Sequence, residues 1–124
     1  KYITSLGIDF MNINKLEKIP FLPINFFKSQ QIISSKDNID KVFVSSGTSG
    51  LKSKHYVYDL NLYEKSLIKS FEYFYGNIKN YTFYALIPSI QSLNDSSLVY
   101  MTKKFIQLSE NANSNFYFNC LIIC

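Results

Sequence analysis

The sequence contains no arginine and no tryptophan, and all thirteen of its basic residues are lysines. Its formal net charge of +4 is modest for a chain of 124 residues. Proteins that read bases or phosphates through paired hydrogen bonds favour arginine, because the guanidinium group presents its donors as a planar fork. The composition therefore disfavours a nucleic-acid partner.

Long apolar runs are also absent. No stretch approaches the roughly 20 apolar residues that cross a bilayer as a helix. The first residues lack the charged-then-apolar pattern of a secretory signal. We therefore expect no membrane span and a cytoplasmic location.

Cysteine and histidine are scarce. The chain has two cysteines, Cys120 and Cys124, without a second pair or a nearby histidine, so we interpret them as small buried side chains in a strand. His55 is the single histidine. No cluster of metal-ligating residues and no Ser/His/Asp pattern is present, so the sequence predicts no metal-binding residue and no hydrolase triad.

What the sequence does contain is enough apolar material for a core. Hydrophobic residues make up 47% of the chain and aromatic residues 17%, all of them Tyr or Phe, which excludes a disordered chain. The length allows at most one domain. An apolar segment at 116–124 reads as a strand without a partner after it. We therefore expect residues 1–124 to form a single incomplete domain.

The punctuation of the chain predicts an α/β fold. The expected elements are strands at 41–45, 54–58, 81–87 and 116–124, a helix from Asn61 to Gly76, and a helix capped by Asn94 or Asp95. The first two strands should form a hairpin-like pair, and strands separated by helices should run parallel in a sheet covered by helices. Residues 1–18 should form a short helix or coil. Residues 19–33 should form an extended apolar arm that covers the sheet or, as the less favoured alternative, lines a substrate groove.

Both expected helices carry an apolar stripe with a spacing of three or four residues. For the first helix, Asn61 with Glu64 three residues later suggests a variant capping box, and Gly76 suggests the C-terminal stop. Its stripe consists of Tyr63, Leu67, Phe71, Phe74 and Ile78. The stripe of the second helix consists of Leu98, Met101, Phe105 and Leu108, with Lys103 and Lys104 facing outward. We interpret both stripes as core.

The most distinctive segment is the loop between the first two strands. It gathers hydroxyls, glycines, lysines and the histidine in Ser45, Ser46, Gly47, Thr48, Ser49, Gly50, Lys52, Lys54 and His55. Glycine permits the positive φ angles that let backbone N–H groups converge on an anion. Hydroxyls add donors and lysine adds a point charge suited to phosphate. The loop therefore predicts a polyphosphate site rather than a plain polar turn.

This loop differs from the common nucleotide-binding loop, because Gly47 and Gly50 are only three residues apart and a strand follows instead of a helix. His55 could contact a phosphate or a carboxylate, and is equally well explained as a hydrogen-bonded structural residue. The polar residues Ser89, Ser96, Ser97 and Tyr100 could line a pocket beside the loop. Helix capping and turn formation are the slightly favoured explanation for them.

The segment Ser45–Gly50 resembles the phosphate loop of the adenylate-forming superfamily. A longer frame resembles the acyl-protein synthetase (LuxE) family; it consists of Ile19–Ile24, the loop, Ser53–Val57, Leu62–Glu64, Leu86–Ser89 and Ser96–Met101. The resemblance runs from about Ile19 to Phe105. It implies that the chain is the N-terminal portion of the large domain of such an enzyme.

The resemblance also implies a reaction. A long-chain fatty acid or another carboxylic acid would be activated with ATP and Mg²⁺ as an acyl-adenylate and then transferred to a protein thiol, with an acyl-CoA reductase-like protein as partner. The residues of Ser45–Gly50 would wrap the outer phosphates, and Lys52 or Lys54 would offset their charge. The superfamily's Pro-Lys is replaced here by Lys52-Ser53. Because the family's later motifs are missing, we expect this chain alone to be inactive.

Two other function classes stay open at this point. The chain could be a non-catalytic phosphate-binding or interaction module derived from such a ligase. A weaker alternative is a phosphotransferase that uses the same loop, which would yield a phosphorylated product and no pyrophosphate.

Overall fold

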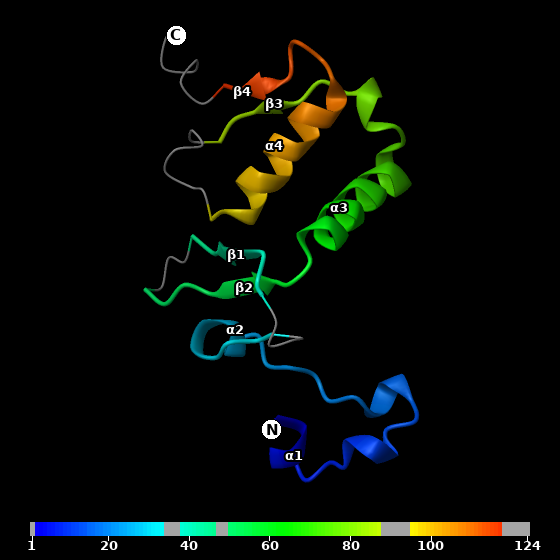
Figure 1. Ribbon diagram of the computed structural model, residues 1–124, viewed down its shortest axis with the longest axis vertical. Coiled ribbons are helices and arrows are strands. Elements are labelled where there is room, and N and C mark those ends of the chain that lie inside the picture. Colours follow the sequence, from blue (N-terminus) through cyan, green and yellow to red (C-terminus); the bar gives the residue numbers. More distant parts are fainter. Residues whose placement is uncertain (1, 34–37, 47–49, 88–94, 118–124) are drawn as a thin grey trace.

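The computed structural model describes residues 2–33, 38–46, 50–87 and 95–117 (Figure 1). Its elements in chain order are α1 (Tyr2–Ser5), η1 (Phe10–Asn12), η2 (Leu16–Lys18), α2 (Phe26–Ser29), β1 (Lys41–Val44), β2 (Lys54–Val57), α3 (Leu60–Tyr75), η3 (Ile78–Asn80), β3 (Tyr84–Ala85), α4 (Ser97–Ser109) and β4 (Asn115–Phe116). Figure 1 shows α3 and α4 between the β1–β2 pair and the β3–β4 pair, with the N-terminal elements at the far end of the molecule. The described chain is thus a mixture of helices and strands.

The first two strands form the expected hairpin. β1 and β2 are antiparallel, with Lys41 opposite Val57 and Val44 opposite Lys54. Each strand is one residue shorter than predicted. The hairpin holds the two ends of the serine-rich loop side by side.

The other two strands differ from expectation in length. β3 and β4 are parallel, with Tyr84 opposite Asn115 and Ala85 opposite Phe116, which confirms the direction predicted for strands on either side of a helix. The strand predicted at 81–87 is only two residues long. Most of the strand predicted at 116–124, with Cys120 and Cys124, lies outside the described residues. Among the described residues the strands form two separate two-stranded sheets, and membership of an adenylate-forming domain stays a prediction.

The predicted N-cap of α3 is wrong. Asn61 lies inside the helix, and the cap is Asp59, whose carboxylate accepts a hydrogen bond from the backbone N–H of Leu62 at 2.8 Å. A second carboxylate, from Asp40, accepts from the N–H of Leu60 at 3.0 Å. Two carboxylates at the first turn satisfy free N–H groups and oppose the positive end of the helix dipole. They therefore fix where α3 begins.

The other helix ends are set by single residues. Gly76 ends α3 as predicted; its φ angle is 80° and its N–H donates to the carbonyl of Glu72. A left-handed angle at this point is open to glycine at little cost. The cap of α4 is Ser96, whose Oγ accepts from the N–H of Val99. Asp95 therefore does not cap α4, and Asn94 lies outside the described residues.

Two aromatic clusters, each with one ring from α3 and one from α4, contribute to the core. Under the hairpin, the Phe43 ring packs on Tyr63 and Tyr100, with centroid separations of 5.2 and 5.4 Å. Under β3, the cluster consists of Phe71, Phe83 and Phe105, with separations of 5.0 to 5.7 Å. Such ring pairs contribute about 0.5–1.5 kcal/mol each beyond burial alone. The two clusters join hairpin, helices and β3 into one packed unit.

The predicted stripes are confirmed in part. Tyr63, Leu67 and Phe71 face inward from α3, whereas Phe74 is 74% exposed. On α4, Phe105 is buried, but the residue that packs at its first turn is Val99, and Leu98 is exposed.

The N-terminal third contains the expected short helical turns up to Lys18. The predicted extended arm at 19–33 is interrupted by α2. Its first turn forms because the N–H of Phe26 donates to the carbonyl of Pro23 at 2.9 Å. The Phe26 ring then packs edge-on against the Tyr2 ring, with a centroid separation of 5.2 Å. No helix among the described residues is both long and apolar enough to cross a membrane.

Candidate functional site

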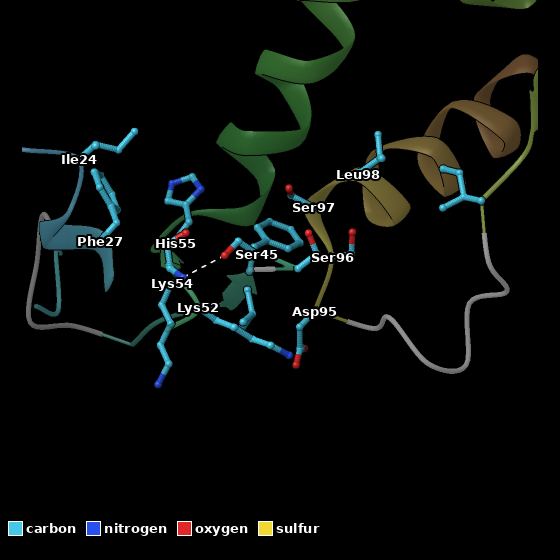
Figure 2. Close-up of a pocket in the computed structure, with 15 residues that line it drawn as sticks. Ile24, Phe27, Ser45, Lys52, Lys54, His55, Asp95, Ser96, Ser97 and Leu98 are labelled. Atoms are coloured by element: carbon cyan, nitrogen blue, oxygen red, sulfur yellow. Dashed lines mark hydrogen bonds between the residues drawn. The ribbon is translucent and has the colours of Figure 1, made fainter. Parts of the chain in front are cut away.

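A hollow of about 730 Å³ opens beside the serine-rich loop (Figure 2). Three parts of the chain line it: α2 with the residues before it, the loop end of the β1–β2 hairpin, and the segments that flank the 88–94 stretch. The lining residues are Ile24, Phe27, Phe43, Val44, Ser45, Ser46, Lys52, Ser53, Lys54, His55, Ile87, Asp95, Ser96, Ser97 and Leu98. Ligand pockets in proteins commonly hold about 300–1,000 Å³, so the volume suits a small organic ligand.

Hydrogen bonds outside the β1–β2 strand pairing hold the two ends of the loop in place. The N–H of Ser45 donates to the carbonyl of Ser53, and the N–H of Ser53 donates to Ser45 Oγ, both at 3.0 Å. Figure 2 shows the second of these bonds as a dashed line. The N–H of Val44 donates to the carbonyl of Asp95 at 2.8 Å. This last bond brings the start of α4 to the loop, across about fifty residues of sequence.

These bonds limit which groups of Ser45 can contact a ligand. The backbone N–H of Ser45 is already paired with Ser53, so it is not a donor for an anion. The Ser45 hydroxyl accepts from Ser53 and keeps its own proton to donate. Ser45 therefore holds the loop ends together, and its hydroxyl proton is the donor that it can still offer to a ligand.

The cationic side of the hollow is formed by Lys52 and Lys54. Both residues are exposed, and neither forms an ion pair with a described residue. Asp95 is the one carboxylate among the described lining residues. The rim therefore carries a surplus of positive charge, which suits an anionic ligand.

His55 lies opposite Phe43 in the hairpin register and lines the same hollow. Its ring meets the Tyr63 ring edge-on at a centroid separation of 6.3 Å. Burial raises the pKa of Tyr63. His55 itself is exposed, whereas Val57, two residues along on the same face and nearer α3, is buried. The His55 side chain is thus accessible from the hollow, and its ring contacts the Tyr63 ring.

Apolar side chains also line the hollow, and they come from each of the three parts that form it. They are Ile24 and Phe27 from the α2 side, Phe43 and Val44 from β1, and Ile87 and Leu98 from the segments before and at α4 (Figure 2). Phe43 is 3% exposed and belongs to the core, while Ile24 and Leu98 are largely exposed. A ligand with an anionic end and an apolar body would match both kinds of lining residue.

The structure brings together most of the predicted site residues that it describes. Ser45, Ser46, Lys52, Lys54 and His55 all line the hollow. The possible pocket residues Ser96 and Ser97 line it as well, beyond the capping role of Ser96. Gly47, Thr48, Ser49 and Ser89 lie outside the described residues.

Two predicted residues have a different place. Gly50 is not part of the lining; its φ angle of +85° lets the chain turn where the loop returns towards β2. Tyr100 does not line the hollow either, because its hydroxyl donates to Glu64 on α3.

Sequence reasoning placed Ile24 and Phe27 at a substrate groove only in its less favoured alternative. It predicted Asp95 as a possible helix cap and Leu98 as core, and assigned neither to the site. The long-range bond from Val44 to the Asp95 carbonyl brings this segment to the hollow.

The described residues at the hollow do not form a metal centre of protein ligands. Among residues 2–33, 38–46, 50–87 and 95–117, no three histidine, cysteine or carboxylate side chains lie close enough to hold a metal ion. A cation at this site would need most of its ligands from a bound molecule and from water.

Comparison with known proteins gives one local similarity. No family model matches the chain, and no solved structure matches it. A stretch of 44 residues is 43% identical to the long-chain-fatty-acid–luciferin-component ligase of Photorhabdus luminescens. The match covers 35% of this chain and 38% of that relative's length, so the chain shares with a fatty-acid ligase a segment of about one third of its own length.

Proposed function

We propose that this chain supplies the polyphosphate-binding part of a ligase that activates a long-chain fatty acid with ATP. The carrying observation is that Ser46, Lys52 and Lys54 meet Ser96 and Ser97 around one hollow that apolar side chains also line. The local similarity to a fatty-acid ligase supports the same reaction class. The large domain of an adenylate-forming enzyme remains the proposed setting.

In the proposed reaction a carboxylate oxygen of the acid attacks the α-phosphorus of ATP. The bond from that phosphorus to the oxygen that bridges to the β-phosphate breaks, and pyrophosphate leaves. The acyl-adenylate then passes its acyl group to a protein thiol, which loses its proton as AMP departs. Most of the catalysis in such a transfer comes from positioning and from neutralising the phosphate charge.

The lysines of the hollow would provide that neutralisation. The Lys52 and Lys54 ammonium groups would contact the outer phosphates, while the hydroxyls of Ser46 and Ser97 would donate to their oxygens. Hydrogen bonds to charged groups contribute about 1.5–3 kcal/mol each. Their removal should therefore affect the reaction far more than the removal of other surface lysines.

Mg²⁺ fits this hollow only as a companion of the phosphates. When bound to ATP it would offset the negative charge that builds up on the leaving pyrophosphate. Asp95 is the described lining residue that could hold it, and magnesium sites with one or two carboxylates plus phosphate oxygens are common.

The apolar lining residues offer a place for the acid. Ile24, Phe27 and Ile87 would contact the hydrocarbon chain next to its carboxylate. Burial of each methylene contributes about 0.8 kcal/mol, so longer acids should bind more tightly until the apolar surface is covered.

The test is ATP–pyrophosphate exchange by the protein with whatever follows Cys124 in its reading frame. We expect exchange that depends on a long-chain acid. Lys52→Ala with Lys54→Ala should reduce it by about 100-fold or more, whereas the control Lys65→Ala with Lys69→Ala, on the exposed side of α3, should leave it unchanged.

Three results would replace the proposal. Absence of exchange across acids of all lengths would favour the non-catalytic phosphate-binding module. A phosphorylated product without pyrophosphate would show a phosphotransferase. Equal losses in the lysine pair and in its control would show that the hollow is not the phosphate site.

A further inference from the structure

A second hollow, which we call the lysine groove, lies between α3, α4 and the start of β1. Its polar lining consists of Lys41, Glu64, Tyr100, Lys103, Lys104 and Gln107. Val99, which is buried, also contributes to the lining. The volume is about 490 Å³. The groove shares no lining residue with the hollow beside the serine-rich loop.

The carboxylate in the groove is already fully engaged. Glu64 accepts a hydrogen bond from the Tyr100 hydroxyl at one oxygen and pairs with the Lys104 ammonium at the other, at 2.7 Å. The side chains of Lys104 and Glu64 are only 28% and 21% exposed. Lys104 therefore serves to hold α4 against α3, and its charge is balanced inside the groove.

Two lysines of the groove form no ion pair with any carboxylate in the part of the chain that the structure describes. The Lys41 ammonium lies 6.0 Å from the centre of the Phe43 ring and forms no ion pair with a described carboxylate. Lys103 is exposed and likewise forms no ion pair with a described residue. The two lysines come from different elements, β1 and α4, and both border the same groove. A concave surface with two uncompensated positive charges attracts anions of matching charge.

We propose that the lysine groove is a second anion site and that it takes a phosphoryl group carried by a small molecule. A phosphate monoester bears about two negative charges, which the Lys41 and Lys103 ammonium groups would balance. The Gln107 amide would add a neutral donor. Lysine binds phosphate as a point charge, so the site needs no planar fork of the kind that arginine provides.

Glu64 and Tyr100 explain why such a group can enter. A free carboxylate in the groove would repel a phosphate. Here the Lys104 ammonium and the Tyr100 hydroxyl both donate to Glu64, so its charge is offset and its oxygens are turned towards their partners. The groove thus presents its cations without a competing anion.

The experiment titrates inorganic pyrophosphate into the Lys52→Gln, Lys54→Gln chain, so that the hollow beside the serine-rich loop does not contribute. Calorimetry gives the affinity, and amide NMR shifts give the place of binding. We expect shifts at residues 99–107. Lys41→Gln with Lys103→Gln in that background should weaken binding about tenfold or more.

The control is Lys15→Gln with Lys18→Gln in the same background. These exposed lysines near the N-terminus do not line the groove and should leave the affinity unchanged. Acetate at matched ionic strength should bind at least tenfold more weakly than pyrophosphate, because it carries one charge.

Any of three outcomes would overturn the proposal. One is a titration that leaves the amides at 99–107 unmoved, and another is equal binding by the Lys41, Lys103 variant and the control. The third is tighter binding of a short glutamate peptide than of pyrophosphate, which would show an acidic-peptide site instead. Because the loop lysines are absent from every sample, each result is independent of the proposed ligase activity.

Discussion

Alkaline pH should destabilise this protein through one tyrosine, and Tyr100→Phe should remove that effect. The Tyr100 ring is half-buried between Phe43 and the α3 side of the core, and its hydroxyl donates to Glu64 at 2.5 Å. Burial, followed by the hydrogen bond to the Glu64 carboxylate, raises the pKa of Tyr100 to about 12 from its ordinary value of 10.0. The folded protein thus resists ionisation of this phenol.

The sign of the effect follows from which state ionises first. Below pH 10 the phenol is protonated in both the folded and the unfolded chain, so its full stabilising contribution is present. As the pH rises from 10 to about 12, the unfolded chain loses the proton while the folded one keeps it. The free energy of unfolding therefore falls through this window.

A pKa difference of about 2 corresponds to about 2.7 kcal/mol. Tyr100 is only half-buried, and water screens part of the interaction, so we expect a loss of about 1–2 kcal/mol by pH 12. At neutral pH, Tyr100→Phe should cost about 1 kcal/mol through the lost hydrogen bond to Glu64. Its stability should then change less with pH than that of the parent.

The assay is urea unfolding followed by far-UV circular dichroism at a series of pH values from about 8 to 11.5. The matched control is Tyr73→Phe on α3, whose side chain is 84% exposed. Other tyrosines and lysines titrate in the same range, so the difference between the two variants isolates Tyr100. The reasoning is refuted if Tyr100→Phe loses as much stability as Tyr73→Phe over this range.

Three further outcomes follow from the packing. Hydrogen bonds from Lys104, then from Tyr100, hold the pKa of Glu64 below its usual value, so its stabilising contribution is present above about pH 4.5 and disappears as the pH falls through the folded pKa. Glu64→Gln should therefore make the free energy of unfolding depend less on pH in the acid range. Urea titrations that show the same acid-range dependence for the variant and the parent would contradict this. Phe105→Ala should lower the free energy of unfolding by about 3–5 kcal/mol because the ring is buried among aromatic neighbours. Phe74→Ala should lower it by less than about 0.5 kcal/mol because this side chain is 74% exposed. Thermal unfolding measures both, and equal losses of stability would disprove the assigned core. Asp59→Ala should cost about 1 kcal/mol in the same assay as the cap of α3 is lost, and an unchanged midpoint would shift the capping role to Asp40.

Local patterns predicted the parts of the fold that local forces determine. The hairpin arises from two short apolar runs on either side of a turn-rich loop, and Gly76 ends α3 because a left-handed angle is needed there. The cap of α3 was missed for a physical reason. The spacing from Asn61 to Glu64 matches a capping box, but Asp59, two residues before Asn61, caps the helix by accepting from the N–H of Leu62. Asp40, which is distant in the sequence, also accepts from the first turn, at the N–H of Leu60.

Periodicity also overextended the core. Phe71 and Ile78 are seven residues apart, which draws a continuous stripe through Phe74. The chain leaves the helix at Gly76 and forms a separate turn, η3, so Ile78 is buried from a new direction. The Phe74 ring then meets the rings of Tyr73 and Tyr75 on the same helix, and these leave it 74% exposed.

The sequence predicted the polar residues of the candidate site, but it placed the apolar arm there only as the less favoured alternative. Ser45, Ser46, Lys52, Lys54 and His55 are contiguous enough for composition alone to single them out. Their assembly with the start of α4 depends on the bond from Val44 to the carbonyl of Asp95, which no local pattern encodes. A contact between residues about fifty positions apart in the sequence depends on how the whole chain packs.

The aromatic cluster of Phe43, Tyr63 and Tyr100 under the hairpin connects the two candidate sites. The Phe43 ring lines the hollow beside the loop, and the Tyr100 ring, 5.4 Å away, lines the lysine groove. Tyr100 is held in turn by Glu64, which pairs with Lys104. Interiors pack too closely for one ring to move alone. The position of the hairpin on α4, and with it the spacing of the phosphate-facing side chains, is therefore set by the same contacts that hold α3 to α4.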